Sequence, residues 1–177
     1  DTSIIDTVAL GYGNHELQDA GTVLFADFEV GHFAAAPKGR PVSLAGLWRF
    51  RLDNRRPDGT PSDFGDERDR KGYGLELGYH KPNYDDSEWA AIRIGTNWES
   101  QGYSYNGVAW YRQRVMIPEA WQGRSLRLQL GKPDDRGEIF LNGEEVGAVT
   151  KYGPNFDITI APKHIKYGET NTLAVRI

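Results

Sequence analysis

The sequence contains no cysteine, which excludes a disulfide scaffold, a thiolate metal site and a cysteine nucleophile. It has no apolar run near the roughly 20 residues that a membrane-spanning helix needs, so we expect no membrane partner. A large excess of one sign of charge is also lacking, because 21 basic and 25 acidic residues leave a net charge of only −4. That balance gives no electrostatic footprint for nucleic acid. No signal-peptide pattern opens the chain, so we expect an exported protein to have lost its signal.

Aromatic residues and turn formers are abundant. Aromatics make up 12% of the 177 residues, with five Trp and nine Tyr, and the chain contains 21 Gly and 9 Pro. This length suffices for one sandwich-sized domain with a small extra segment. The composition favours an all-β protein with many loops.

The clearest strands lie between residues 107 and 147. Leu126, Leu128 and Leu130 alternate with Arg127 and Gln129, and alternation with a period of two predicts one buried face and one wet face. In the preceding strand the same rule puts Ala109, Tyr111, Val115 and Ile117 on one face, and Trp110, Arg112, Arg114 and Met116 on the other. Asn142-Gly143 predicts a tight hairpin turn, because both residues tolerate positive φ.

Further strands are expected over residues 22–30, 44–52, 89–94, 156–160 and 173–177. About eight strands, with no helix longer than a turn or two, predict an all-β fold: an antiparallel two-sheet β-sandwich. We expect residues 1–40 to form an N-terminal extension with one strand, joined to the sandwich at 41–177 by the small-residue link 31–41. The last residues continue a strand pattern, so we expect a larger protein.

Residues 53–71 are the longest polar stretch. Their alternating charges and turn residues predict a solvated loop that buries no core. A wall of a binding site is the alternative for this stretch.

Several motifs together resemble a known family. They include Gly46-Leu-Trp-Arg-Phe50, Tyr84-Asp-Asp-Ser-Glu-Trp89, Asn97-Trp-Glu99, Ala109-Trp-Tyr-Arg112, Ile139-Phe-Leu-Asn-Gly143 and Gly168-Glu-Thr-Asn-Thr-Leu-Ala-Val-Arg176. From about Pro41 onward the chain resembles the N-terminal sugar-binding domain of family 2 glycoside hydrolases, a galactose-binding-like jelly roll. The same signature occurs in jelly rolls attached to sialate O-acetylesterases and other polysaccharide-degrading enzymes.

The resemblance implies a carbohydrate-binding accessory module of an exported bacterial enzyme, secreted or periplasmic. Its partners would be a glycan or polysaccharide and a catalytic domain of the same polypeptide. The alternative is a purely structural domain that packs against the catalytic domain and never touches sugar. A fold match does not decide between them.

We find no catalytic machinery in this chain. A glycosidase needs two carboxylates at a set separation, but Asp85-Asp86 and Asp134-Asp135 lie in turn-like sequence, where turn capping explains them. The four histidines are scattered, and no Gly-x-Ser-x-Gly elbow or dinucleotide fingerprint occurs. No cofactor is expected. A structural Ca²⁺ is left open, since it would need six to eight oxygen ligands and no spacing demands it.

A sugar site needs flat aromatic faces and planar hydrogen-bonding groups. The 95–106 loop and the 150–156 connection offer that mixture. The candidate ligand-binding residues are Trp98, Glu99, Gln101, Tyr103, Tyr105, Asn106, Lys151 and Tyr152. The competing interpretation is that Trp98 is buried and the tyrosines cover the ends of the sheets.

Overall fold

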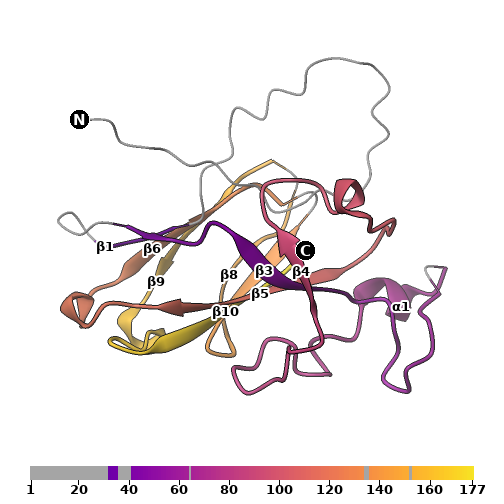
Figure 1. The fold of residues 1–177 in the computed structure, drawn as a ribbon, viewed down its shortest axis with the longest axis horizontal. Helices are drawn as coiled ribbons and strands as arrows, with labels where there is room; N and C mark the ends of the chain where they lie inside the picture. Colours follow the sequence, from indigo (N-terminus) through magenta and orange to yellow (C-terminus); the bar gives the residue numbers. More distant parts are fainter. Residues whose placement is uncertain (1–31, 36–40, 64, 134–135, 152) are drawn as a thin grey trace, which may run out of the picture.

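A computed structural model describes residues 32–35, 41–63, 65–133, 136–151 and 153–177. These residues form ten strands, one short α-helix and three 3₁₀-helices (Figure 1). The strands are β1 (His32–Ala35), β2 (Val42–Ser43), β3 (Leu47–Leu52), β4 (Ala90–Arg93), β5 (Ala109–Met116), β6 (Leu126–Leu130), β7 (Gly137–Leu141), β8 (Glu144–Val149), β9 (Phe156–Ile160) and β10 (Thr170–Arg176). The helices are α1 (Glu67–Lys71), η1 (Glu99–Gln101), η2 (Glu119–Trp121) and η3 (Pro162–His164). In the described ranges no helix is long and apolar enough to cross a membrane.

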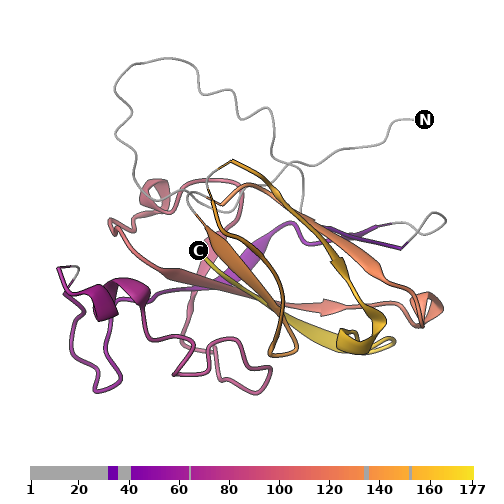
Figure 2. The ribbon, with the colours of Figure 1, turned by 180° about the vertical axis from the view of Figure 1, so that it is seen from behind.

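The strands form two antiparallel sheets. One has the order β4-β3-β5-β10-β7-β8 and the other β2-β1-β6-β9, and Figure 2 shows both from behind. The predicted all-β antiparallel sandwich is therefore confirmed. The predicted hairpin turn is confirmed as well, because Asn142 and Gly143 have φ values of 54° and 92° between β7 and β8, as a type I′ turn requires.

The main core lies between the sheets. Leu126 and Leu128 are 0% exposed and Leu130 is 2% exposed, so the alternation in β6 predicted the buried face correctly. Trp48, Phe50 and other large side chains of the six-stranded sheet belong to the same cluster. Each fully buried side chain of this size contributes about 1.5–3 kcal/mol, so this layer is the main source of stability.

The N-terminal boundary differs from the expected link. Strand β1 lies inside the small-residue segment 31–41 and pairs with both β2 and β6, for example Phe33 with Leu128. Small residues suited to a link therefore also fit a strand inside a sheet, here between β2 and β6. The strand expected over residues 22–30 lies outside the described residues.

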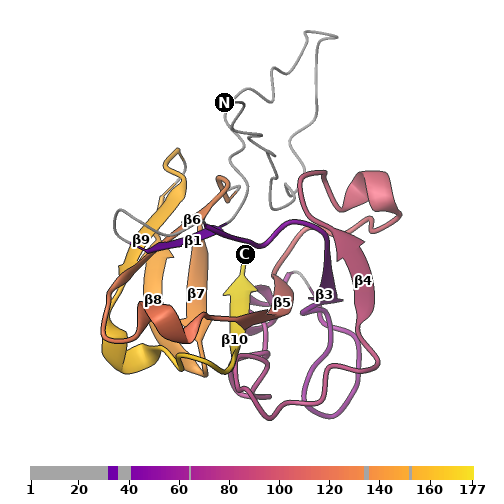
Figure 3. The same cartoon turned by 60° about the vertical axis from the view of Figure 1, so that its left-hand side comes forward.

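The outer face of the six-stranded sheet differs from the prediction more strongly. Trp110 and Arg112, predicted on the wet face of β5, are 0% and 1% exposed. They are covered by residues 53–89, here called the cover segment. It lies on the side of β3, β5 and β10 away from β1 and β6 (Figure 3). The sheet is therefore buried on both faces at Trp110 and Arg112, whereas Arg114 and Met116, predicted on the same wet face, are exposed.

Candidate functional site

Trp98, the fourth residue of the 95–106 loop, faces inward. It is 1% exposed and its ring centroid lies 6.0 Å from that of Phe50 in the main core. A buried ring offers no face for a sugar to stack on. The side chain therefore fixes the loop to the sandwich.

Gln101, at the end of η1, is bound to the backbone of β4. Its Oε1 accepts from Arg93 N at 2.9 Å, and its Nε2 donates to Arg93 O and Thr96 Oγ1, each at 2.9 Å. An edge strand exposes such backbone groups to unwanted pairing. The amide here caps the end of an edge strand, so its planar hydrogen-bonding groups are already engaged.

The two loop tyrosines are half-buried. The Tyr103 ring packs edge-on against Phe50, with centroids 4.8 Å apart. The Tyr105 hydroxyl donates to Asp53 O at 3.2 Å, and burial, followed by the charges of Asp53 and Asp69, raises the pKa of Tyr105 to about 12. Both rings join the loop to neighbouring segments.

The remaining candidates are less constrained. Asn106 and Lys151 are exposed, and Glu99 is half-buried with an Oε1 for which the described residues supply no hydrogen-bond donor. Tyr152 lies outside the described residues. Of the predicted set, Asn106 and Trp98 line the same hollow, whereas the structure does not place Lys151 there.

That hollow is an open groove of about 1280 Å³ between α1, residues 106–108 and the β7–β8 hairpin. Its apolar residues include Leu75, which is 43% exposed, together with Val108, Val149 and Ile177. Charged residues of both signs also line the hollow. Six of them form three ion pairs, Arg68–Glu76, Lys71–Glu67 and Arg176–Glu138, at 2.6, 2.7 and 2.8 Å. We call this hollow the interface groove.

A buried charged network attaches the cover segment to the sheet. Arg112 donates to Asp86 Oδ2 at 2.7 Å and to Lys81 O at 3.1 Å, and also bonds Tyr79 O. Arg114, whose side chain is 50% exposed, donates to the other Asp86 oxygen at 3.0 Å. Burial alone would raise the pKa of Asp86, but the hydrogen bonds from both arginines outweigh it and lower that pKa.

Two further buried carboxylates organise the polar stretch. Asp53 accepts from Tyr73 N, Gly74 N and Trp110 Nε1 at 2.8, 2.8 and 2.9 Å. Asp69 accepts from Arg56 and from Asp63 N, and the Arg56 bond is the largest cause of its pKa falling to about 2. Residues 53–71 were predicted as a solvated loop that buries no core. That prediction is wrong at these two carboxylates. Each is buried and accepts hydrogen bonds from N–H groups of the protein in place of water.

Asp69 and Asp86 do not suit the role of a general acid. A general acid needs a raised pKa, and the pKa values of Asp69 and Asp86 are lowered. Asp85 caps its turn as predicted, with Oδ1 accepting from Ser87 N at 3.0 Å. Among the described residues, no group of three or more His, Asp or Glu side chains could hold a metal ion.

Asp53, Asp69, Asp86 and Arg112 are buried although the sequence pattern did not predict it. The alternation pattern depends on polarity alone. It therefore predicts that an Arg at a polar position faces solvent, even where that Arg is buried. The available signal was the aromatic density of residues 73–89, which exceeds what a solvated loop needs.

The fold and these contacts define an antiparallel β-sandwich domain whose six-stranded sheet is covered on both faces at its centre. Residues 73–177 match the family model described as beta-galactosidase second all-beta domain. Because this match covers more than half of the chain, the chain belongs to that family. It is an accessory all-β domain of family 2 glycoside hydrolases.

Among known proteins, the chain is similar to the beta-galactosidase BoGH2A of Bacteroides ovatus. The two are 30% identical over 131 residues, which cover 66% of this chain and 15% of that protein. It is also similar to a β-glucuronidase from Ruminococcus gnavus in complex with C6-substituted uronic isofagomine, at a TM-score of 0.60 and 16% identity. That match covers 98% of this chain and 24% of the other. A likeness at this identity concerns the fold alone.

Proposed function

We propose that this domain is a scaffold of a glycoside hydrolase, which packs against a neighbouring domain of the same polypeptide through the interface groove. The proposal rests mainly on what the groove contains. Apolar residues, Leu75 among them, lie inside a rim of both charge signs, and interfaces between domains of one chain are similarly mixed. The chain spans about 15% of the length of the curated relative it matches, which leaves ample room for such a neighbour.

The candidate sugar loop supports the same choice. Trp98 is buried, Gln101 is engaged by Arg93, and Tyr105 is bonded to Asp53. Their rings and polar groups stabilise the domain, so we infer that this loop acts mainly on the fold.

Glycan recognition is the second candidate function. It is favoured by the exposure of Asn106 and Lys151, whose amide and ammonium groups can hydrogen-bond to sugar hydroxyls. An exported bacterial enzyme with a polysaccharide substrate would suit either function, and export stays a prediction.

The scaffold proposal predicts a protected groove in the parent polypeptide. Leu75→Glu should lower the melting temperature of the complete enzyme, because a carboxylate would replace an apolar contact at the interface. Leu47→Glu is the matched control, since Leu47 is 62% exposed and does not line the groove. Equal melting temperatures for the two variants would contradict the proposal.

Affinity electrophoresis on neutral glycans separates the second candidate from the first. Saturable retention of the 177-residue chain, lost in Asn106→Ala with the fold intact, would favour glycan recognition. No retention on any neutral glycan would favour the scaffold.

A further inference from the structure

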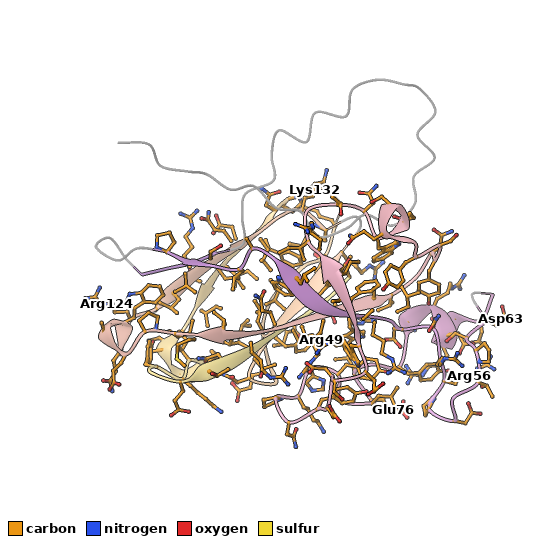
Figure 4. All side chains as sticks on the ribbon, in the orientation of Figure 1. Arg49, Arg56, Asp63, Glu76, Arg124 and Lys132 are labelled. Carbon is orange, nitrogen blue, oxygen red and sulfur yellow. The ribbon has the colours of Figure 1, made fainter. Side chains whose placement is uncertain are left out.

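A second, smaller hollow lies on the outer side of the six-stranded sheet, between β3 and the cover segment. It measures about 220 Å³, and its lining includes Arg51, Arg55, Arg56, Leu77, Tyr79 and Tyr84. We call it the arginine pocket. Figure 4 shows the labelled Arg56 in this part of the molecule, at the opposite end from Arg124.

Charge distinguishes the arginine pocket from the interface groove. Three arginines are among the residues that line the pocket, and no described Asp or Glu is. Asp69, just outside the lining, compensates one of them through its 2.6 Å ion pair with Arg56. Positive charge around a partly enclosed space raises the local concentration of anions.

Each of the three arginines is held in place by a different contact. The Arg51 guanidinium lies 5.5 Å from the centroid of the Tyr79 ring, and Arg55 donates one N–H to Gly59 O at 3.0 Å. A guanidinium has five N–H donors, so these contacts leave Arg51 and Arg55 able to bind a further acceptor. Their planar forks match the geometry of carboxylate and sulfate oxygens.

The surrounding loop is ordered by its own hydrogen bonds. Arg56 N donates to Thr60 O and Gly59 N donates to Arg56 O, each at 2.9 Å, and an isolated bridge joins Arg55 to Pro61. Such preorganisation lowers the cost of ordering the site when a ligand binds.

The opposite wall is apolar and aromatic. Tyr79 and Tyr84 pack edge to face with centroids 5.0 Å apart, beside Leu77. Aromatic rings suit the apolar face of a sugar. The volume lies below the roughly 300–1,000 Å³ of pockets for drug-sized ligands, so it suits one sugar ring and not an oligosaccharide.

We propose that the arginine pocket binds a single acidic sugar residue, with its carboxylate or sulfate group between Arg51 and Arg55 and its ring against Tyr84. This inference goes beyond the proposed function and does not depend on it, because the interface groove and the arginine pocket share none of their lining residues.

The test is an NMR titration of the 177-residue chain with glucuronate, glucose 6-sulfate, glucose, acetate and inorganic sulfate. Saturable shifts with glucuronate or glucose 6-sulfate are expected, and the stronger of these two identifies the anionic group. Glucose, acetate and sulfate should each bind at least about tenfold more weakly, because each lacks the charge or the ring, and tenfold corresponds to about 1.4 kcal/mol.

Variants locate the binding. Arg51→Gln and Arg55→Gln should each weaken glucuronate binding at least about tenfold, whereas Arg136→Gln, in the interface groove, should not change it. Far-ultraviolet circular dichroism checks the fold of each variant, and the exposed Arg55 keeps the test valid if Arg51→Gln unfolds. The proposal is overturned by absent saturation with both acidic sugars, by equal binding of acetate or sulfate, or by unchanged affinity in folded Arg55→Gln.

Discussion

The cover segment (residues 53–89) and the 95–106 loop are both rich in aromatic and polar residues, and both pack against the six-stranded sheet. They are held in different ways. The cover segment is attached by buried charges, notably Arg112 with Asp86, whereas the loop is attached by the buried ring of Trp98 and the amide of Gln101. Similar composition therefore gives segments whose stability depends on different physical terms. Breaking each attachment in turn sharpens the comparison.

The largest effect is expected at Arg112. Arg112→Met should destabilise the protein by about 3–5 kcal/mol, because it leaves Asp86 buried with one remaining cation and removes the donor to Tyr79 O and Lys81 O. Urea unfolding followed by tryptophan fluorescence measures the loss. Arg114→Met is the matched control: half-exposed pairs contribute at most about 1 kcal/mol. Equal losses in the two variants would refute a special role for the buried charge.

A smaller loss is expected in the loop. Gln101→Leu removes three hydrogen bonds. Because the site is half-exposed and water can replace part of each bond, we expect the low end of the usual contribution, about 0.5 kcal/mol per bond and roughly 1.5 kcal/mol in total. Amide exchange of Arg93 should accelerate. Gln101→Glu keeps the acceptor for Arg93 N and should lie between the parent protein and Gln101→Leu. Unchanged exchange at Arg93 in Gln101→Leu would show that the amide does not hold the loop.

The smallest effect is acid sensitivity of the cover segment. Hydrogen bonds, that from Arg56 first, lower the pKa of Asp69 from its ordinary value of 3.8 to about 2 in the folded protein. As pH falls, the unfolded chain binds its proton first, so this stabilisation is present above about pH 4 and lost toward pH 2. The urea midpoint of Asp69→Asn should therefore vary less with pH in that window than that of the parent protein. Between pH 6 and 7, the internal control, the urea midpoints of the two proteins should change with pH to the same extent. An equal change with pH in the two proteins between pH 2 and 4 as well would contradict this assignment.

The sandwich could be predicted because its strands have one apolar face. Leu126, Leu128 and Leu130 repeat with the period of a strand and are buried, and Asn142-Gly143 fixes its hairpin through backbone conformation alone. These features are local in the sequence, and local patterns are what periodicity detects.

The outer face could not be predicted in the same way. Arg112 occupies a polar position in the alternation, and its burial depends on Asp86 and on carbonyl groups from a segment far earlier in the chain. The candidate sugar residues raise the same difficulty. Tyr105 and Gln101 have suitable chemistry for a ligand, but Asp53 O and Arg93 already use it. Composition indicates which groups a side chain can bind. It does not indicate whether other groups of the same protein already occupy that side chain.

The most direct test of the doubly covered sheet is hydrogen exchange of the Trp110 indole N–H, measured by NMR on the 177-residue chain. This group is buried and donates to Asp53 Oδ2 at 2.9 Å. Our account predicts that it exchanges only as fast as the whole domain unfolds. Exchange at the rate of a solvent-exposed indole would mean that the outer face is wet, and would contradict the account.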